Sequence, residues 1–315
     1  MIILFEYVYP NSNSSSACDL RRLQITAKTL GLNTIILSPY FSETGDTTSL
    51  ELDLLRFSGN INETAIFIGY IPDAVNYAAL ERALSSANIK LINTTEEHLR
   101  VMEFDQFYPL IEKLTPKSAI VNNSSGARFA ANSIGYPVFV KGLIKSLKER
   151  GLTSCIANND DELNSIVAEL LIDNRTRNRV TRNRVVVREL VDLVKYGKCC
   201  HLNDLPVTRE FRIHLYNGEI LGSSFHWPFA KDTLNGYDLK EVDLALDPMR
   251  DQKALEIARE AAKLIATPLM VVDVGQKTDG EWIVIEVGDL QCCGLSNMSH
   301  YLFFNHLEQI MLNKK

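Results

Sequence analysis

The segment from Pro268 to Asp289 constrains the fold more than any other part of the sequence, because it predicts a complete β-hairpin. Two apolar, β-branched runs, Leu269–Val274 and Trp282–Val287, flank a polar stretch that contains Asp279-Gly280. An Asp-Gly pair between two such runs is a strong signal for a tight hairpin turn. We therefore expect two neighbouring antiparallel strands near the C-terminus.

The same hairpin brings two carboxylates together. If its loop has two residues, Thr278 pairs with Glu281, and Asp273 pairs with Glu286 on one face. Two carboxylates this close repel each other unless a cation lies between them. We predict a metal site with oxygen ligands, most simply for Mg²⁺, to which Asp289 adds a third oxygen. The alternative is an exposed acidic pair on a solvated face of the sheet.

Length and composition limit the classes of protein. The 315 residues are enough for two domains, and the 46% hydrophobic and 23% charged fractions are ordinary for a globular protein. A net charge of −6 does not favour nucleic acid as a partner. No apolar run is long enough to span a membrane, and Met1–Pro10 lacks the basic segment and cleavage site of a signal peptide. We expect a cytoplasmic protein without a membrane partner, whose six cysteines, with no C-x-x-C spacing, are reduced thiols.

The N-terminal part of the chain alternates between short apolar strands and helical segments. Helical periodicity runs from Asp19 to Leu30 and from Ala74 to Ala87, and this alternation predicts a parallel sheet covered by helices. The stretch Asn11–Ser16 follows the first strand, where such folds often bind ligands, but it lacks G-x-G-x-x-G and is expected to be a plain loop. The expected strands are Ile2–Tyr7, Thr34–Leu37, Thr64–Ile68 and Ile89–Ile92.

A second hairpin is predicted over Thr208–Phe225, centred on Asn217-Gly218. Polar and apolar residues alternate along its first strand. Period two places Glu210 and Arg212 on one face and the apolar residues on the other. We expect Arg212 to be presented by a rigid strand.

An arginine-rich run precedes this hairpin and contains a tandem TRNRV repeat. Such a run can bind an anionic partner, but more often it is a solvated loop, and both interpretations stay open. It leads into an expected strand, Val185–Val187, that ends at Glu189. The arginines are Arg175, Arg177, Arg179, Arg182, Arg184 and Arg188.

The chain thus carries, in order, the groups that a polyphosphate needs. The strand Val138–Val140 delivers Lys141, a hairpin presents Arg212, and the last hairpin presents Asp273 and Glu286. Lysine supplies a point charge, arginine a bidentate fork, and Mg²⁺ bridges phosphate oxygens. The sequence G-x-x-x-x-G-K-[ST] is absent, which excludes a P-loop.

This order of groups resembles the ATP-grasp superfamily. In that superfamily ATP lies between two α+β subdomains with antiparallel sheets, behind a smaller N-terminal α/β domain. The resemblance implies an N-terminal α/β domain over residues 1–103 and an ATP-grasp domain over residues 104–315. The ATP-grasp domain then divides into a first subdomain, 104–192, and a second subdomain with the metal site, 193–315.

The resemblance also implies roles for single residues. Lys141 is similar to the family's phosphate-binding lysine, and Lys145 or Lys148 fits its second lysine. Arg212 resembles the phosphate-binding arginine, and we expect Arg212 and Lys148 to act in catalysis. The other implied residues are Glu189 and Leu190 at the adenine, Asp192 at the ribose, Glu210 beside Arg212, and Asp273, Glu286 and Asp289 at Mg²⁺.

The sequence departs from the common family pattern in two places. The usual ending E-x-N, whose Asn binds metal, is here Glu286-Val287-Gly288-Asp289, similar to a less characterised clade. Whether Asp289 replaces that Asn is left open. The glycine-rich loop of many members is also missing between Lys141 and Gly151.

The resemblance implies an ATP- and Mg²⁺-dependent ligase. ATP phosphorylates a carboxylate, and an amine then attacks the acyl phosphate to form a C–N bond, with small molecules, amino acids or peptides as substrates. The enzyme's part is mainly positioning and electrostatics. One alternative is a small-molecule kinase on the same fold, and another is a nucleotide-binding protein without turnover. Many members are dimers, so the resemblance is compatible with a homodimer.

Overall fold

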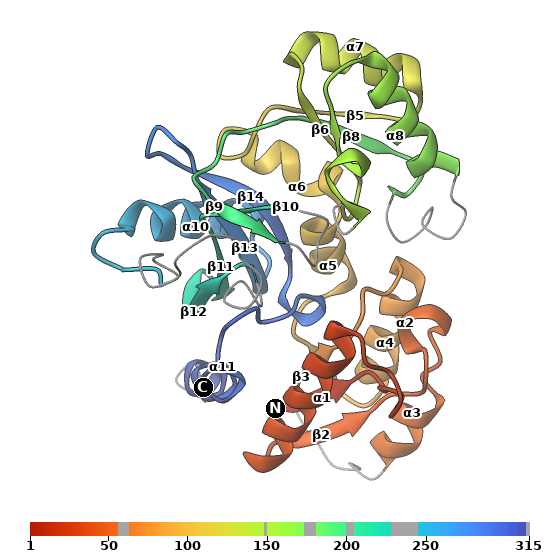
Figure 1. Ribbon diagram of the computed structural model, residues 1–315. Helices are drawn as coiled ribbons and strands as arrows, with labels where there is room; N and C mark the ends of the chain where they lie inside the picture. The colour runs from red at the N-terminus through yellow and green to blue at the C-terminus, as the bar shows by residue number, and fades with distance from the viewer. Residues whose placement is uncertain (56–62, 148–149, 173–180, 200–204, 228–244, 313–315) are drawn as a thin grey trace.

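The computed structural model describes residues 1–55, 63–147, 150–172, 181–199, 205–227 and 245–312. Within these ranges, three four-stranded sheets are surrounded by helices, and a small two-stranded sheet pairs β9 with β10. Figure 1 shows the three parts around the larger sheets following one another along the chain, from red through green to blue. Lys148 and the arginines at 175, 177 and 179 lie outside the described residues.

The first large sheet is parallel, as predicted, with strand order β2-β1-β3-β4, and we call it the N-terminal sheet. Side chains alternate along β1. Ile3 and Phe5 pack on the side of α1, while Ile2 and Leu4 pack with residues of α2, α3 and α4. The elements are β1 (Ile2–Phe5), α1 (Ser15–Thr29), β2 (Asn33–Ile36), α2 (Phe41–Thr44), α3 (Thr48–Leu54), β3 (Glu63–Ile68), α4 (Ala74–Ser86) and β4 (Ile89–Leu91).

The central sheet is antiparallel and has the order β5-β8-β6-β7. Val138, Val140, Val185 and Val187 lie on the face that packs against α7 and α8, at the top of Figure 1. The elements that lead to it and form it are α5 (Thr95–Met102), α6 (Phe104–Ile111), β5 (Ser118–Val121), α7 (Ser124–Ile134), β6 (Val138–Gly142), η3 (Leu152–Ser154), β7 (Ile156–Ala157), α8 (Asp160–Ile172) and β8 (Val185–Glu189).

The C-terminal sheet is antiparallel with the order β12-β11-β13-β14. Phe211, Ile213 and Val272 face a core that α10 and α6 complete. The elements are β9 (Lys195–Cys199), β10 (Leu205–Thr208), β11 (Glu210–Tyr216), β12 (Glu219–Phe225), α10 (Gln252–Ile265), β13 (Leu269–Gln276), β14 (Trp282–Asp289), η6 (Leu290–Cys292) and α11 (His300–Leu312).

Both hairpins predicted in the C-terminal part are present, and one has the predicted turn. Asn217 and Gly218 have φ values of 49° and 78°, and Tyr216 pairs with Glu219, so this loop has two residues. Positive φ at both loop positions explains why Asn-Gly occurs here. The β13–β14 hairpin closes differently, as described below.

The N-terminal and C-terminal sheets share one hydrophobic core. Ile3 and Phe5 of β1 lie in the same cluster of buried residues as Leu269 and Val271 of β13 and Phe304 of α11. The helices α1 and α11 also contact each other. The N-terminal sheet is therefore packed directly on the part of the molecule that carries the predicted metal carboxylates.

The strands of each large sheet fall within one of the three predicted segments, 1–103, 104–192 or 193–315. The parallel sheet followed by two antiparallel sheets agrees with the predicted fold class. In the described ranges, no helix combines the length and apolarity that crossing a membrane requires. The four cysteines whose side chains are described, Cys18, Cys155, Cys292 and Cys293, are free thiols.

Candidate active site

Three charged residues lie in one row across the C-terminal sheet. Arg212 of β11 is the cross-strand partner of Asp273 on β13, and Asp273 is the partner of Glu286 on β14. Directly paired residues share a face, so the row places one cation and two carboxylates side by side. The predicted pairing of Asp273 with Glu286 is confirmed.

The route to this pairing differs from the prediction. Gln276 pairs with Trp282, so Thr278 does not pair with Glu281 as in a two-residue loop. Gly280, at φ 91°, instead donates its N–H to the Lys277 carbonyl. The register then shifts at Ile285, which forms a β-bulge. The longer loop moves the register by one residue and the bulge moves it back, so the two changes cancel.

Asp273 is buried and held by two cationic groups. The Arg212 Nε and Nη2 atoms donate to its two oxygens at 2.8 and 2.7 Å, and His226 Nδ1 lies 3.4 Å from Oδ2. Burial alone would raise the pKa of Asp273, but the Arg212 guanidinium, and after it His226, hold that pKa well below its usual range. Asp273 is therefore a permanent carboxylate.

Lys141 reaches the row from the central sheet. It lies on β6 with only 3% of its surface exposed, and its Nζ donates to Glu286 Oε1. Its ammonium also lies 5.8 Å from the centre of the Phe104 ring. The predicted phosphate lysine and a predicted metal carboxylate are thus paired across the gap between two sheets.

The other predicted phosphate contacts are less enclosed. Lys145 is exposed and lines the cavity described below, while Lys148 is outside the described residues. Glu210 is buried two positions before Arg212 on β11 and accepts a hydrogen bond from the Thr208 hydroxyl. Of these, the structure brings Lys145 and Arg212 to one cavity.

The predicted adenine segment connects the central and C-terminal sheets. Glu189 ends β8, and its N–H donates to the Lys117 carbonyl at 2.9 Å. Leu190 is exposed, as is Asp192, whose carboxylate accepts from Lys195 at 2.9 Å. The Asp192 carbonyl accepts the Thr278 N–H at 3.1 Å, which fixes this segment to the β13–β14 loop.

Asp289 lies away from the row, and its predicted role as a metal ligand is wrong for this structure. The strand β14 continues to Asp289, so period two turns its side chain to the face opposite Glu286. There it is fully buried, accepts a hydrogen bond from Asn93 Nδ2 at 3.0 Å, and lies 2.8 Å from His98 Nδ1. It connects the end of the N-terminal sheet to β14.

Gly288 explains why the usual asparagine is missing. It shares a face with Glu286, but a Cβ atom at this position would lie 2.7 Å from Cys293 Sγ. No side chain fits there unless Cys293 moves. The described residues contain no cluster of three or more His, Cys, Asp or Glu side chains able to hold a metal. The donor set is therefore Asp273 and Glu286, which suits Mg²⁺, since this ion commonly takes one or two carboxylates and completes its shell with phosphates and water.

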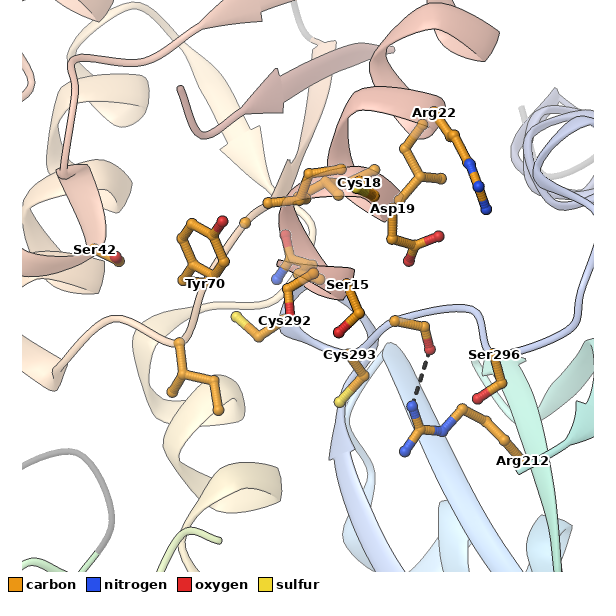
Figure 2. A pocket seen from close by; sticks show the side chains of 18 of the residues that line it. Ser15, Cys18, Asp19, Arg22, Ser42, Tyr70, Arg212, Cys292, Cys293 and Ser296 are labelled. Atoms are coloured by element: carbon orange, nitrogen blue, oxygen red, sulfur yellow. Dashed lines mark hydrogen bonds between the residues drawn. The ribbon is translucent and has the colours of Figure 1, made fainter. Parts of the chain in front are cut away.

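A cavity of about 1000 Å³ opens between the N-terminal sheet and this row. Figure 2 shows Arg212 and Ser296 on one side, Ser15, Cys18 and Asp19 of α1 on the other, and Cys292 and Cys293 between them. Arg212 Nη1 donates to the Gly294 carbonyl at 2.9 Å on this wall. Sequence reasoning misses most of the lining. The available signal is the position of residues 11–16 directly after the first parallel strand, a stretch expected to be a plain loop.

A buried carboxylate holds the N-terminal wall of this cavity. Glu6 is 1% exposed, and its two oxygens accept the N–H groups of Ser42 at 2.9 Å and Tyr70 at 2.7 Å. Ser42 and Tyr70 follow β2 and β3 and line the cavity. Gly69 permits the contact, because a Cβ there would lie 2.7 Å from Glu6 Oε2. Glu6 thereby joins the carboxyl ends of three parallel strands.

The cavity cysteines are poor nucleophiles. Burial raises the pKa of Cys293 to about 12, although Arg212 opposes the shift, and burial raises the pKa of Cys292 well above its ordinary value. The thiolate is the reactive form of cysteine, so neither thiol is primed for covalent catalysis. This agrees with the expectation that both cysteines serve in packing.

Two α+β parts around a cleft that carries paired lysine, arginine and carboxylate groups, behind a parallel α/β part, define the ATP-grasp class. The chain belongs to this family: a model for an ATP-grasp domain, the third family of its clade, matches residues 103–307. A comparison with curated proteins found no match.

Solved structures support the fold. D-alanine–D-alanine ligase from Bacillus anthracis is 13% identical, with a TM-score of 0.60 over 100% of this chain and 98% of that one. A RimK domain protein ATP-grasp from Sphaerobacter thermophilus is 14% identical, with a TM-score of 0.55 over 98% and 100%. The D-cycloserine synthetase DcsG is 12% identical, with a TM-score of 0.57 over 99% and 100%. At these identities the likeness concerns the fold alone.

Proposed function

We propose that this protein is a Mg²⁺- and ATP-dependent ligase that activates a carboxylate as an acyl phosphate and joins it to an amine. The observation that carries the proposal is the row Arg212–Asp273–Glu286 with Lys141 paired across it, at the edge of a large cavity. A triphosphate and its metal need this combination of a fork, a point charge and two carboxylates. Family membership supports ATP as the nucleotide.

In this proposal each charged residue has a defined task. Lys141 and Arg212 bind the phosphates, and Lys145 adds a further cation from the cavity wall. Asp273 and Glu286 hold Mg²⁺, which when bound neutralises charge on the phosphates. The segment from Glu189 to Asp192 binds the adenosine part, as the family resemblance implied. Binding orients the carboxylate against the phosphate, and positioning supplies much of the rate.

The lining of the cavity supports an amino acid or short peptide as substrate. Arg212, His226 and Lys145 give its phosphate side a positive character, which suits a carboxylate, while Asp19 and Glu43 contribute negative charge from α1 and α2. A substrate with a carboxylate and an ammonium group complements both. A cavity of about 1000 Å³ also has room for two substrates together.

The kinase alternative loses part of its basis. It rested on the arginine run as a site for an anionic acceptor. Arg182 Nε donates to Glu103 at 3.1 Å, and Arg184 Nη1 donates to Asp105 at 2.6 Å, so these two arginines are already paired with carboxylates. No described contact favours the kinase over the ligase.

Hydroxylamine trapping tests the proposal. An acyl phosphate reacts with hydroxylamine to give a hydroxamate, so amino acids and dipeptides are screened with ATP, Mg²⁺ and hydroxylamine, and ADP and hydroxamate are both measured. We expect equal amounts of both products with the correct carboxylate. The Glu286→Gln variant, which keeps the size of the side chain but removes its charge, should form neither while it remains folded.

Other outcomes contradict the ligase. ADP release with a phosphorylated product and no hydroxamate from the substrate would identify a kinase. Binding of ATP without ADP in the presence of every candidate would indicate a protein that binds nucleotide without turnover. Full activity of Glu286→Gln would refute the metal assignment.

A further inference from the structure

Arg188 is the member of the arginine run that the interpretation as a solvated loop does not describe. It lies on β8, is 6% exposed, and alternates with Val187, whose side chain faces α7 and α8. Period two therefore directs Arg188 to the opposite face of the central sheet, the face of Lys141 and Val186. This face is turned toward the C-terminal sheet, since Val186 packs in that sheet's core.

The guanidinium of Arg188 crosses to β14 and contacts its bulge. Nη1 donates to the Ile285 carbonyl at 2.6 Å, and Nη2 donates to the Val284 carbonyl at 3.2 Å. Nη2 also donates to Thr115 Oγ1 at 2.5 Å, and the Thr115 hydroxyl itself donates to the Val284 carbonyl at 2.9 Å. Nε has no acceptor among the described residues, so the described hydrogen bonds of Arg188 all converge on this point.

The bulge decides which way Glu286 faces. Beyond it, Val274 pairs with Val284, and continuing that register without a bulge would pair Asp273 with Ile285 and Val272 with Glu286. Val272 is fully buried in the core under α10. A slip of one residue turns every following side chain to the other face of the sheet. Glu286 would then face the core and not the cleft.

Arg188 is suited to hold such an irregular backbone. A bulge leaves carbonyl groups without their regular ladder partners. An arginine fork donates two or more charge-assisted hydrogen bonds in a fixed geometry, which a lysine ammonium on a shorter, flexible stem does not reproduce. The donor comes from the central sheet, so the same contacts also fix the central sheet to β14.

We propose that Arg188 is a positioning residue for the metal site: by clamping the Val284–Ile285 bulge from β8, it sets the register that presents Glu286 beside Asp273. The proposal rests on the metal role of Glu286 given above. Arg188 binds neither substrate nor metal in it. Its effect reaches the site through the backbone of β14.

Binding of Mn²⁺ tests this proposal without turnover. Mn²⁺ serves as a spectroscopic substitute for Mg²⁺, and its affinity for the full chain is measured by electron paramagnetic resonance in the presence of a nonhydrolysable ATP analogue. Loss of a residue that orients a metal ligand typically weakens metal binding by about 10- to 100-fold. We expect a loss in this range for Arg188→Lys, which keeps the charge but not the fork, and a smaller loss for Thr115→Val.

Arg209→Lys is the matched control. Arg209 has the same exposed fraction, 6%, and its guanidinium binds Asp251 and Gln276, away from the bulge. The substitution removes the same groups from a buried arginine of the C-terminal sheet. We expect it to lower the melting temperature but to leave the Mn²⁺ affinity unchanged, which separates positioning from general destabilisation.

Hydrogen exchange provides the second measurement. Amides of residues 282–289 should exchange faster in Arg188→Lys than in the wild type and in Arg209→Lys. Wild-type Mn²⁺ affinity and unchanged exchange in Arg188→Lys would overturn the proposal. If Arg188→Lys does not fold, Thr115→Val decides by the same two measurements. If the wild type itself binds no Mn²⁺ with the analogue, the proposed function fails, and the exchange rates alone decide whether Arg188 clamps the bulge.

Discussion

The residues of the charged row neutralise one another before any ligand binds. Arg212 holds Asp273 with two hydrogen bonds, and Lys141 holds Glu286 with one. A buried cation without a partner is costly, so each predicted phosphate ligand uses a predicted metal ligand as its counter-ion. Binding of nucleotide and metal would exchange these partners and keep the total charge balanced.

His214 lies two residues from Arg212 and gives a prediction at this scale. It is fully buried, and burial, followed by the charge of Arg212, lowers its pKa to about 3. The unfolded chain binds a proton near pH 6.5, whereas the folded chain does not until about pH 3, so this residue makes stability fall as the pH falls between these values. The slope is about 1.4 kcal/mol per pH unit for one proton.

His214→Leu removes this proton, so its unfolding free energy should fall by about 2 kcal/mol less than that of the wild type between pH 7 and pH 5. Urea unfolding at both pH values measures the difference. Parallel pH dependence of the two proteins would show that His214 is protonated in the folded state.

At the scale of the element, β14 divides its acidic residues between two tasks. The bulge turns Glu286 toward the cleft, and the regular alternation after it turns Asp289 into the joint with the N-terminal sheet. There Asn93 links Asp289 to the β13 backbone, since its amide exchanges two hydrogen bonds with Leu269 at 2.8 and 2.9 Å. Gln291, directly after the strand, donates to Tyr77 Oη at 2.6 Å.

Asp289→Asn should therefore change stability and leave metal binding unchanged. The new amide group points at donors, namely Asn93 Nδ2 and the Gln291 N–H, and a buried unpaired donor costs about 1–3 kcal/mol. We expect a lower melting temperature with wild-type Mn²⁺ affinity in the presence of the ATP analogue. A selective loss of Mn²⁺ affinity would restore Asp289 to the metal site.

At the scale of the whole molecule, the cavity lies where the separate parts meet. Its lining comes from α1, from the loops after β2 and β3, from Lys145 after the central sheet's β6, and from the segment after β14. The shared core beneath β1 and β13 holds two of these walls together. The Lys141–Glu286 and Arg188–Ile285 contacts connect the third part across the cleft.

This arrangement predicts that nucleotide and metal stabilise the protein only together. Mg²⁺ alone must displace Lys141 and Arg212 from their carboxylates, and ATP alone must leave both carboxylates without a cation. Both ligands at about a hundred times their dissociation constant should stabilise the fold by roughly 2.7 kcal/mol, a shift of several degrees in melting temperature.

Thermal melting with Mg²⁺, with ATP and with both measures this synergy. The Glu286→Gln variant is the informative control, because it releases Lys141: ATP alone should stabilise it more than the wild type, and Mg²⁺ should add little. Equal, additive shifts from the two ligands in the wild type would contradict the exchange of partners.

The sequence by itself determined what depends on neighbours along the chain. Period two in Phe211–Leu215 placed Arg212 on its face, Asn217-Gly218 specified its turn, and strand–helix alternation indicated the parallel sheet. The order of Lys141, Arg212, Asp273 and Glu286 was enough to indicate the family. All of these signals are local, so one sequence contains them.

Tertiary structure alone decided the rest. The pairing of Asp273 with Glu286 was predicted, but its cause, a bulge held by Arg188 from a different sheet, involves distant residues, since Arg188 and Ile285 are 97 residues apart in the sequence. The fate of Asp289 depended on where β14 ends and on Asn93 and His98, and the cavity walls came from loops that only the packed core brings together. Hydrogen bonds and burial between distant segments have no periodicity along the chain, and they therefore become visible only in the folded molecule.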